Sequence, residues 1–366
     1  MREYFVIFVV AGAITYFATP FVRAVAVATN AFTPVRERDV HSTPTPRLGG
    51  VAIFLGFAAA GLVARELPYL KGVYSSGQIS GVLMGAAIVC LVGAIDDIRE
   101  LDWLTKLAGQ ILAAGVMAYK GVLLLSVPFF GTSTVLPTPV LVAVTVIVVL
   151  ATVNAVNFID GLDGLAVGVV AIAALAFFIY SYYISNSYNP PNVFSNATFI
   201  SAAVLGCCLG FLPHNFHPAR LFMGDSGALL LGLLLAAATI SLSGSVDPGS
   251  ANGGSLTAAL LPIAVPLAVL SLPFLDMVLA VARRTLAGKN PWDPDRKHLH
   301  HRMLDLGHGH RNAVLILYMW AALLALGTVS LAFVESWRAA VVIGVCLAVV
   351  VTLTVWLPRW TRPKRL

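Results

Sequence analysis

Long apolar runs recur along the whole chain, and they constrain its fold more than any other feature. A run needs roughly 20 residues to cross about 30 Å of hydrocarbon as a helix. Inside lipid every backbone polar group needs an internal partner, which a helix provides. The sequence therefore predicts an all-α transmembrane helix bundle. The predicted spans number about eleven and cover residues 3–28, 48–64, 79–95, 104–119, 139–158, 164–184, 197–213, 226–243, 257–282, 312–333 and 338–357.

The composition agrees with a lipid environment. Charged residues make up 11% of the 366 residues and hydrophobic residues 58%, whereas soluble domains carry about 25% charged residues. The chain has a net charge of +6. Basic residues collect on the cytoplasmic loops of membrane proteins, which accounts for this charge, so we expect no nucleic-acid partner. The four cysteines lie within apolar runs. They predict buried small side chains and neither disulfides nor a zinc site.

Basic residues predict the orientation. If the N-terminus is outside, seventeen of the 23 Lys and Arg residues fall in inner segments and five in outer segments. Such a bias places the C-terminus in the cytoplasm. We expect one integral-membrane domain in the inner (cytoplasmic) membrane, with its active site facing the cytoplasm. The predicted active-site loops lie near residues 29–47, 96–106, 158–164, 214–226 and 284–311.

Two adjacent carboxylates, Asp96 and Asp97, close the third predicted span. Acids at a helix C-terminus oppose the helix dipole, which favours cations there. A bound divalent cation would offset this cost. The alternative is a solvated acidic end of the helix.

The segment 154–164 reads NAVNFIDGLDG. Asn154, Asn157 and Asp160 recur every three residues, and Asp163 continues the series. A polar stripe on an apolar helix end is costly in a membrane unless it lines a wet cavity. Paired glycines permit a close backbone approach to a ligand. The alternative is a turn with helix caps.

An FMGDSG segment precedes the eighth predicted span and contains Asp225. An aspartate at this position is a good helix N-cap. The free N–H groups of a helix N-terminus also form an anion site that suits a pyrophosphate. The motif alone leaves both roles open.

The longest inner loop contains NPWDPDRKHLHHR at 290–302. Histidines beside arginines suit a loop that holds phosphate. No cysteine is nearby and the other motifs offer carboxylates, so oxygen ligands and Mg²⁺ or Mn²⁺ fit better than zinc.

Two further features carry polar groups. The segment HSTPTPRLGG at 41–50 presents Arg47 just before a span, where the alternative role is simple anchoring to the membrane surface. Asp276 lies inside the ninth predicted span, and we expect it to face the bundle interior in a supporting or structural role.

Taken in order, these motifs resemble the polyprenyl-phosphate N-acetylhexosamine-1-phosphate transferase family (MraY/WecA type). The likeness runs from about His41 to Arg302 in five separated blocks. HLHHR at 298–302 and PRLGG at 46–50 look like the branch that uses UDP-GlcNAc. The resemblance implies a Mg²⁺-dependent transfer of GlcNAc-1-phosphate from UDP-GlcNAc to a polyprenyl phosphate, with release of UMP. It also implies initiation of cell-envelope glycopolymer synthesis, and it suggests a homodimer.

The resemblance also implies residue roles. Catalytic roles fall on Asp96, Asp97, Asp160, Asp163, His298, His300 and His301. Substrate-binding roles fall on Arg47, Lys106, Asn157, Gly161, Leu162, Asn215, Phe222 and Arg302. Asp225 matches the aspartate taken as a Mg²⁺ ligand, with Asp97 beside it. Gly161, Leu162 and Asp163 resemble the turn that binds uracil.

Three alternatives stay open. The first is a different donor, such as UDP-MurNAc-pentapeptide or another UDP-aminosugar. The second is a membrane transporter, which should carry polar groups near the midplane and on both faces. The third concerns mechanism, because an aspartyl intermediate would make the transfer a two-step reaction. We expect the aspartate pair to act in positioning and metal binding, since a phosphate with a second pKa near 6 is already largely a dianion at neutral pH.

Overall fold

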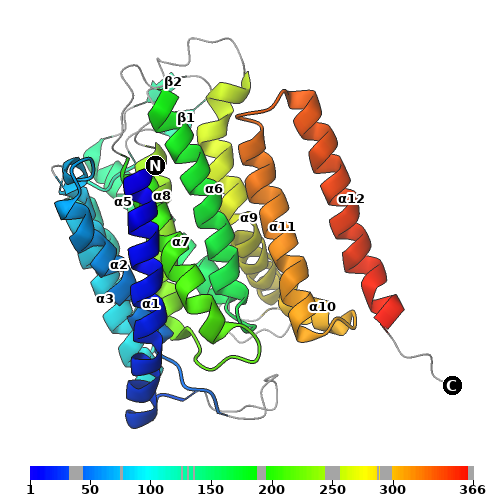
Figure 1. Ribbon diagram of the computed structural model, residues 1–366, viewed down its shortest axis with the longest axis horizontal. Coiled ribbons are helices and arrows are strands. Elements are labelled where there is room, and N and C mark those ends of the chain that lie inside the picture. The colour runs from blue at the N-terminus through cyan, green and yellow to red at the C-terminus, as the bar shows by residue number, and fades with distance from the viewer. Residues whose placement is uncertain are drawn as a thin grey trace.

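The computed structural model describes residues 1–32, 44–74, 77–124, 127–129, 132–134, 137–187, 195–243, 256–286, 288 and 299–361 (Figure 1). Within them the chain forms twelve α-helices and one short 3₁₀ turn, Lys71–Tyr74. The helices are α1 Arg2–Ala28, α2 Gly49–Glu66, α3 Gln78–Arg99, α4 Trp103–Tyr119, α5 Thr138–Ile159, α6 Leu165–Ser187, α7 Asn196–Asn215, α8 Gly224–Ser243, α9 Leu256–Leu286, α10 Leu299–Asp305, α11 His310–Ser330 and α12 Ser336–Thr361.

The prediction of a polytopic helical bundle is confirmed. Ten helices in the described part of the chain are long and apolar enough to cross a membrane. The remaining predicted span corresponds to α4, whose 17 residues stand at the short limit for a transmembrane helix. The compartment that each end of the bundle faces stays a prediction.

One short hairpin departs from the all-helical prediction. Strands β1 (Val127–Phe129) and β2 (Thr132–Thr134) pair antiparallel in the connection between α4 and α5. Valine, phenylalanine and threonine favour extended strands. In Figure 1 the hairpin lies at the top of the bundle, away from α10 at the bottom.

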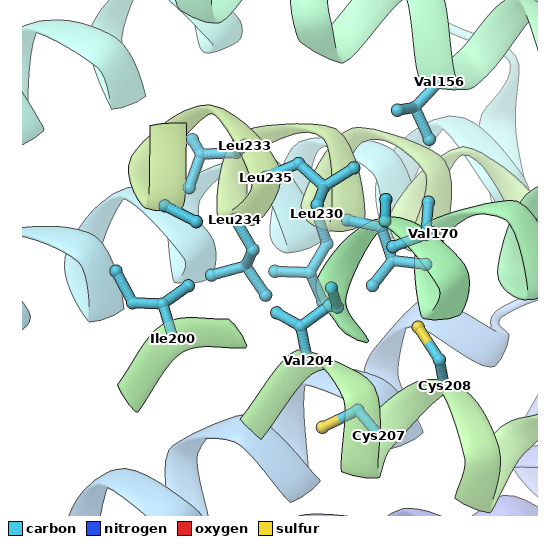
Figure 2. Close-up of a cluster of buried hydrophobic side chains, with 14 of the residues drawn as sticks. Val156, Val170, Ile200, Val204, Cys207, Cys208, Leu230, Leu233, Leu234 and Leu235 are labelled. Atoms are coloured by element: carbon cyan, nitrogen blue, oxygen red, sulfur yellow. The ribbon is translucent and has the colours of Figure 1, made fainter. Parts of the chain in front are cut away.

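Helix α8 is the centre of the packing. It contacts α2, α3, α5, α6, α7 and α9, and its leucines are buried on all sides, among them Leu230, Leu233, Leu234 and Leu235. Figure 2 shows Leu230 and Leu234 on the side of α8 that faces Ile200 and Val204 of α7. A helix that is apolar all round belongs in the interior of a bundle. Its N-terminus is therefore held in place by its neighbours, and the polar motifs gather around that end.

Candidate active site

Asp97 caps the N-terminus of the central helix. Its Oδ1 accepts a hydrogen bond from the backbone N–H of Asp225 at 2.9 Å, and its Oδ2 accepts from Ser226 at 3.1 Å. The first N–H groups of a helix have no partner within the helix, and a carboxylate there is favourable. The N-terminus of α8 thus offsets part of the cost of a carboxylate at the C-terminal end of α3, a cost for which the sequence suggested a bound cation.

Two glycines allow α3 to come this close to α8. Gly224 has φ +70°, and a Cβ there would lie 2.3 Å from Oδ2 of Asp97. A Cβ on Gly93 would lie 2.5 Å from the backbone of Ser226. Any side chain at either position would force the two helices apart.

The carboxylate of Asp225 joins four helices. Its Oδ2 lies 2.9 Å from Nζ of Lys106, and its Oδ1 accepts a hydrogen bond from Nδ2 of Asn157 at 3.3 Å. The same Nζ lies 2.7 Å from Oδ2 of Asp96. The second carboxylate oxygen of Asp96 accepts from the backbone N–H of Leu101 at 2.7 Å. The ammonium group of Lys106 therefore sits between two carboxylates that the sequence places 129 residues apart.

Arg47 lies at the edge of this cluster. Its backbone pairs with Phe222 in a parallel bridge, and its Nε donates to the main-chain oxygen of Asp97 at 3.0 Å. Gly49 and Gly50, which follow Leu48, donate their N–H groups to the main-chain oxygens of Phe222 and Met223, each at 3.0 Å. The end of the proline-rich segment 41–50 is thus part of the site. Arg47 therefore does more than anchor the chain to the membrane surface.

The turn between α5 and α6 forms the other side of the site. The backbone N–H of Gly164 donates to Oδ1 of Asn215 at 3.1 Å, and Nδ2 of Asn215 donates to the main-chain oxygen of Leu221 at 3.1 Å. Asn215 is buried. Its amide ties the turn that contains Gly161 and Leu162 to the segment that leads into α8.

The described carboxylates outnumber the described cations here. Asp96, Asp97, Asp160, Asp163 and Asp225 contribute five carboxylates, and Lys106 and Arg47 contribute the cations that contact this cluster. Burial, followed by the charges of Asp225, Asp97 and Asp163, raises the pKa of Asp160 to about 8. Like charges gathered in one place disfavour ionisation, and a divalent cation would relieve this. The donor set therefore fits a hard cation with oxygen ligands.

The histidine-rich segment is described only in part. His298 lies outside the described residues, and α10 carries His300 and His301, whose side chains lie outside them too. Arg302 is exposed. Oδ1 of Asp276 accepts from the backbone N–H of Leu299 at 2.8 Å. Asp276 is buried and holds the first residue of α10, which agrees with the supporting or structural role that we expected for it. The roles of the histidines and of Arg302 stay predictions.

Two histidines of the site went unnoticed in the sequence. Nδ1 of His217 lies 2.9 Å from Oδ2 of Asp163, and the backbone N–H of Asp163 donates to Nε2 of His310 at 3.2 Å. His217 follows Asn215 by two positions in the sequence NFHPA, and that spacing was the available signal. His310 begins α11, and nothing near it in sequence points to Asp163.

Comparison with known proteins identifies the family. The profile of Glycosyl transferase family 4 matches residues 79–243. The decaprenyl-phosphate N-acetylglucosaminephosphotransferase of Mycolicibacterium smegmatis is 43% identical over 359 residues, which cover 97% of this chain and 88% of that protein. The chain belongs to glycosyl transferase family 4. The matched region runs from α3 to α8 and so includes both carboxylates that contact Lys106. The family predicted from the motifs is confirmed.

Two more distant relatives mark branches of glycosyl transferase family 4. A Bacillus subtilis protein named probable undecaprenyl-phosphate N-acetylglucosaminyl 1-phosphate transferase is 30% identical, over 93% of this chain and 88% of its own length. The phospho-N-acetylmuramoyl-pentapeptide-transferase of Desulforudis audaxviator is 31% identical, but that match covers 56% of this chain and 64% of that protein. Similarity over nearly the full length thus lies with the relatives named for N-acetylglucosamine.

Proposed function

We propose that this protein transfers GlcNAc-1-phosphate from UDP-GlcNAc to a polyprenyl phosphate. The products are polyprenyl-diphospho-GlcNAc and UMP. The observation that carries the proposal is the 43% identity over 97% of the chain with a decaprenyl-phosphate N-acetylglucosaminephosphotransferase. The cluster of Asp96, Lys106 and Asp225 supports it, because it offers both a cation and cation ligands to two anionic substrates.

Asp225 and Asp96 are the residues that would hold Mg²⁺ or Mn²⁺. Their carboxylates converge on one point, which the ammonium group of Lys106 occupies. Asp97 has both oxygens engaged by backbone N–H groups, so its part is to fix the position of Asp225. A divalent cation held by these carboxylates would supply positive charge to the diphosphate of the donor and to the leaving phosphate.

The chain orients the two substrates for an in-line displacement. A lipid phosphate oxygen forms a bond to the β-phosphorus of the donor, and the bond from that phosphorus to the bridging oxygen of UMP breaks. Lys106 contacts phosphate oxygens with its ammonium group. A lipid phosphate with a second pKa near 6 is already largely ionised, so no side chain has to remove a proton.

The polar groups meet at one end of the bundle, which favours a transferase over a transporter. The site joins the C-terminal ends of α3, α5 and α7 to the N-terminal ends of α2, α4, α8 and α11. A transporter should place its polar groups near the midplane and on both faces. We propose that this end faces the cytoplasm, in agreement with the bias of basic residues. The homodimer stays a prediction.

Purified protein in detergent should release UMP when it is given UDP-GlcNAc, a polyprenyl phosphate and Mg²⁺. The lipid product should carry one GlcNAc and two phosphates by mass spectrometry. Omission of the lipid is the control for plain hydrolysis of the donor. No UMP release with UDP-GlcNAc, but release with UDP-MurNAc-pentapeptide, would overturn the choice of donor. Parallel reactions with EDTA measure the dependence on a divalent cation.

Replacement of Lys106 by methionine is expected to tighten Mn²⁺ binding about tenfold and to lower turnover about a hundredfold. The ammonium group now lies 2.7 Å from Asp96 and 2.9 Å from Asp225, so its removal frees two carboxylates for the cation. The same change removes a phosphate contact. Electron paramagnetic resonance of a Mn²⁺ titration reports the affinity, and a steady-state assay reports the turnover.

Lys120→Met is the matched control for the lysine variant. Lys120 is an exposed lysine that follows the other end of the same helix, α4, and its loss should change neither quantity. An unchanged or weaker Mn²⁺ affinity in Lys106→Met would contradict the placement of the cation between Asp96 and Asp225.

A further inference from the structure

Asp163 is held from two sides by segments far apart in the sequence. Its Oδ2 lies 2.9 Å from Nδ1 of His217 and accepts a hydrogen bond from the backbone N–H of Ala219 at 3.1 Å. Its own backbone N–H donates to Nε2 of His310 at 3.2 Å. Its side chain is 1% exposed. The two imidazole rings stack with centroids 4.1 Å apart.

The hydrogen-bond partners of His217 and His310 determine which nitrogen of each ring carries a hydrogen. An ionised carboxylate is only an acceptor, so His217 must carry a hydrogen on Nδ1 and donate it to Asp163. A protonated imidazolium ring has no acceptor, so His310, which accepts at Nε2, is neutral with its hydrogen on Nδ1. One histidine thus donates to the side chain of Asp163, and the other accepts from its backbone.

Helix α11 makes two more contacts, one to the segment after α7 and one to the α5–α6 turn. Nε of Arg311 donates to the main-chain oxygen of His217 at 3.1 Å. The hydroxyl of Tyr318, farther along the helix, donates to the main-chain oxygen of Gly164. The start of α11 therefore fixes both the α5–α6 turn and the segment after α7.

The start of α11 also connects to the histidine-rich segment. Helix α10 ends in a tight turn in which the N–H groups of Leu306 and His308 donate to the main-chain oxygens of Arg302 and Met303, at 3.0 and 3.2 Å. His310 follows after Gly309 and begins α11. A shift of α10 on ligand binding would thus reach Asp163 through a short, hydrogen-bonded stretch of chain.

We propose that His217 and His310 are positioning residues that hold the Gly161–Asp163 turn, which resembles a uracil-binding turn, in the conformation that receives the nucleotide of the donor substrate. This inference rests on the proposed function. The histidines act through Asp163 and make no contact with the reacting phosphates. They affect the affinity for the nucleotide, and they affect neither the affinity for the lipid nor the rate of the chemical step.

A metal site is the competing interpretation of the same three residues. One ligand atom from each of Asp163, His217 and His310 lies within 4.8 Å of the others. However, Nδ1 of His217 and Nε2 of His310 each already form a hydrogen bond with Asp163. Neither nitrogen is thus free to bind a metal without the loss of that bond.

The test separates loss of the hydrogen bond from loss of the ring. His310→Phe keeps a flat ring but has no acceptor, whereas His310→Gln retains an acceptor for the N–H of Asp163. His217→Leu removes the donor, whereas the side-chain N–H of His217→Asn can replace it. His308→Phe is the matched control, because His308 contacts the main-chain oxygen of Thr354 in α12 instead of the turn.

His310→Phe and His217→Leu should each raise KM for UDP-GlcNAc about tenfold, because the first takes the acceptor from the N–H of Asp163 and the second removes one of the two donors to its buried Oδ2. KM for the polyprenyl phosphate and kcat at saturation should stay within about twofold of wild type. The Gln and Asn variants should regain most of the nucleotide affinity. In the double variant KM for UDP-GlcNAc should rise by less than the product of the two single-variant factors, because both changes act on Asp163.

Isothermal titration with UDP-GlcNAc and Mg²⁺ measures nucleotide affinity without turnover, and Tm in detergent reports folding. An equal rise in both KM values, or a nucleotide Kd at the wild-type level, would overturn the proposal. So would one zinc per chain in the wild type that both variants lose. Failure of the proposed function gives a different result, since wild-type protein itself would neither bind UDP-GlcNAc nor release UMP.

Discussion

Replacement of Asp225 by asparagine is expected to lower kcat about a thousandfold and to abolish tight Mn²⁺ binding. Its carboxylate is the group that Lys106 and Asn157 contact at the N-terminus of α8, and the proposal makes it the main cation ligand. Asparagine keeps the shape but not the charge. Lys106 would then lie beside one carboxylate, Asp96, where two now balance it. Turnover and a Mn²⁺ titration on the same preparation measure both effects.

Asp102→Asn is the matched control for this loss of a carboxylate. Asp102 is exposed and accepts from the N–H groups of Leu104 and Thr105 at the start of α4, each at 3.1 Å. Asparagine is an equally good helix cap, so turnover should change little. If Asp225→Asn retained Mn²⁺ affinity and lost only kcat, the cation would have to be held elsewhere. If kcat and Mn²⁺ affinity were both unchanged, the active site would have to lie elsewhere in the protein.

The helices were readable from the sequence because lipid demands long apolar runs. The prediction for 79–95 found α3, and that for 226–243 found α8 almost residue for residue. Spacing also identified Asp160 and Asp163 at the end of α5. These signals are local, since each depends on the length of one run or on the turn that ends it. The hairpin of β1 (Val127–Phe129) and β2 (Thr132–Thr134) was missed because three-residue strands have no such pattern.

The arrangement inside the site was not readable in the same way. The sequence grouped Asp96 with Asp97, yet the structure gives them different partners. Asp96 points to Lys106, and Asp97 accepts from the backbone of α8. Neighbouring residues at a helix end diverge by about 100° around the axis, so only the packing of α3 on α8 and α4 decides what each one meets. The contact between His310 and Asp163 likewise exists only because α11 packs on α6.

Replacement of Asp97 by asparagine is expected to lower kcat about a hundredfold and to weaken Mn²⁺ binding about tenfold. Both oxygens of Asp97 accept backbone N–H groups. Asparagine has one acceptor, so its NH₂ group would face one of these N–H groups with no acceptor between them. The first turn of α8 would shift and move Asp225 away from Lys106. Asp97→Asn is therefore expected to lower kcat and Mn²⁺ affinity because the first turn of α8 moves, and with it the carboxylate of Asp225.

The pH dependence of the Asp97 variant discriminates between a positioning role and a proton-accepting role. Both oxygens of Asp97 already accept backbone N–H groups that fix the position of α8, and the lipid phosphate needs no base. The profile of kcat against pH should therefore keep both of its limbs while the whole curve falls. Disappearance of the acidic limb would mean that Asp97 is the base after all. Recovery of a labelled phosphosugar bound to the protein would instead establish the two-step route, and Asp97→Asn should then prevent that labelling if Asp97 is the nucleophile.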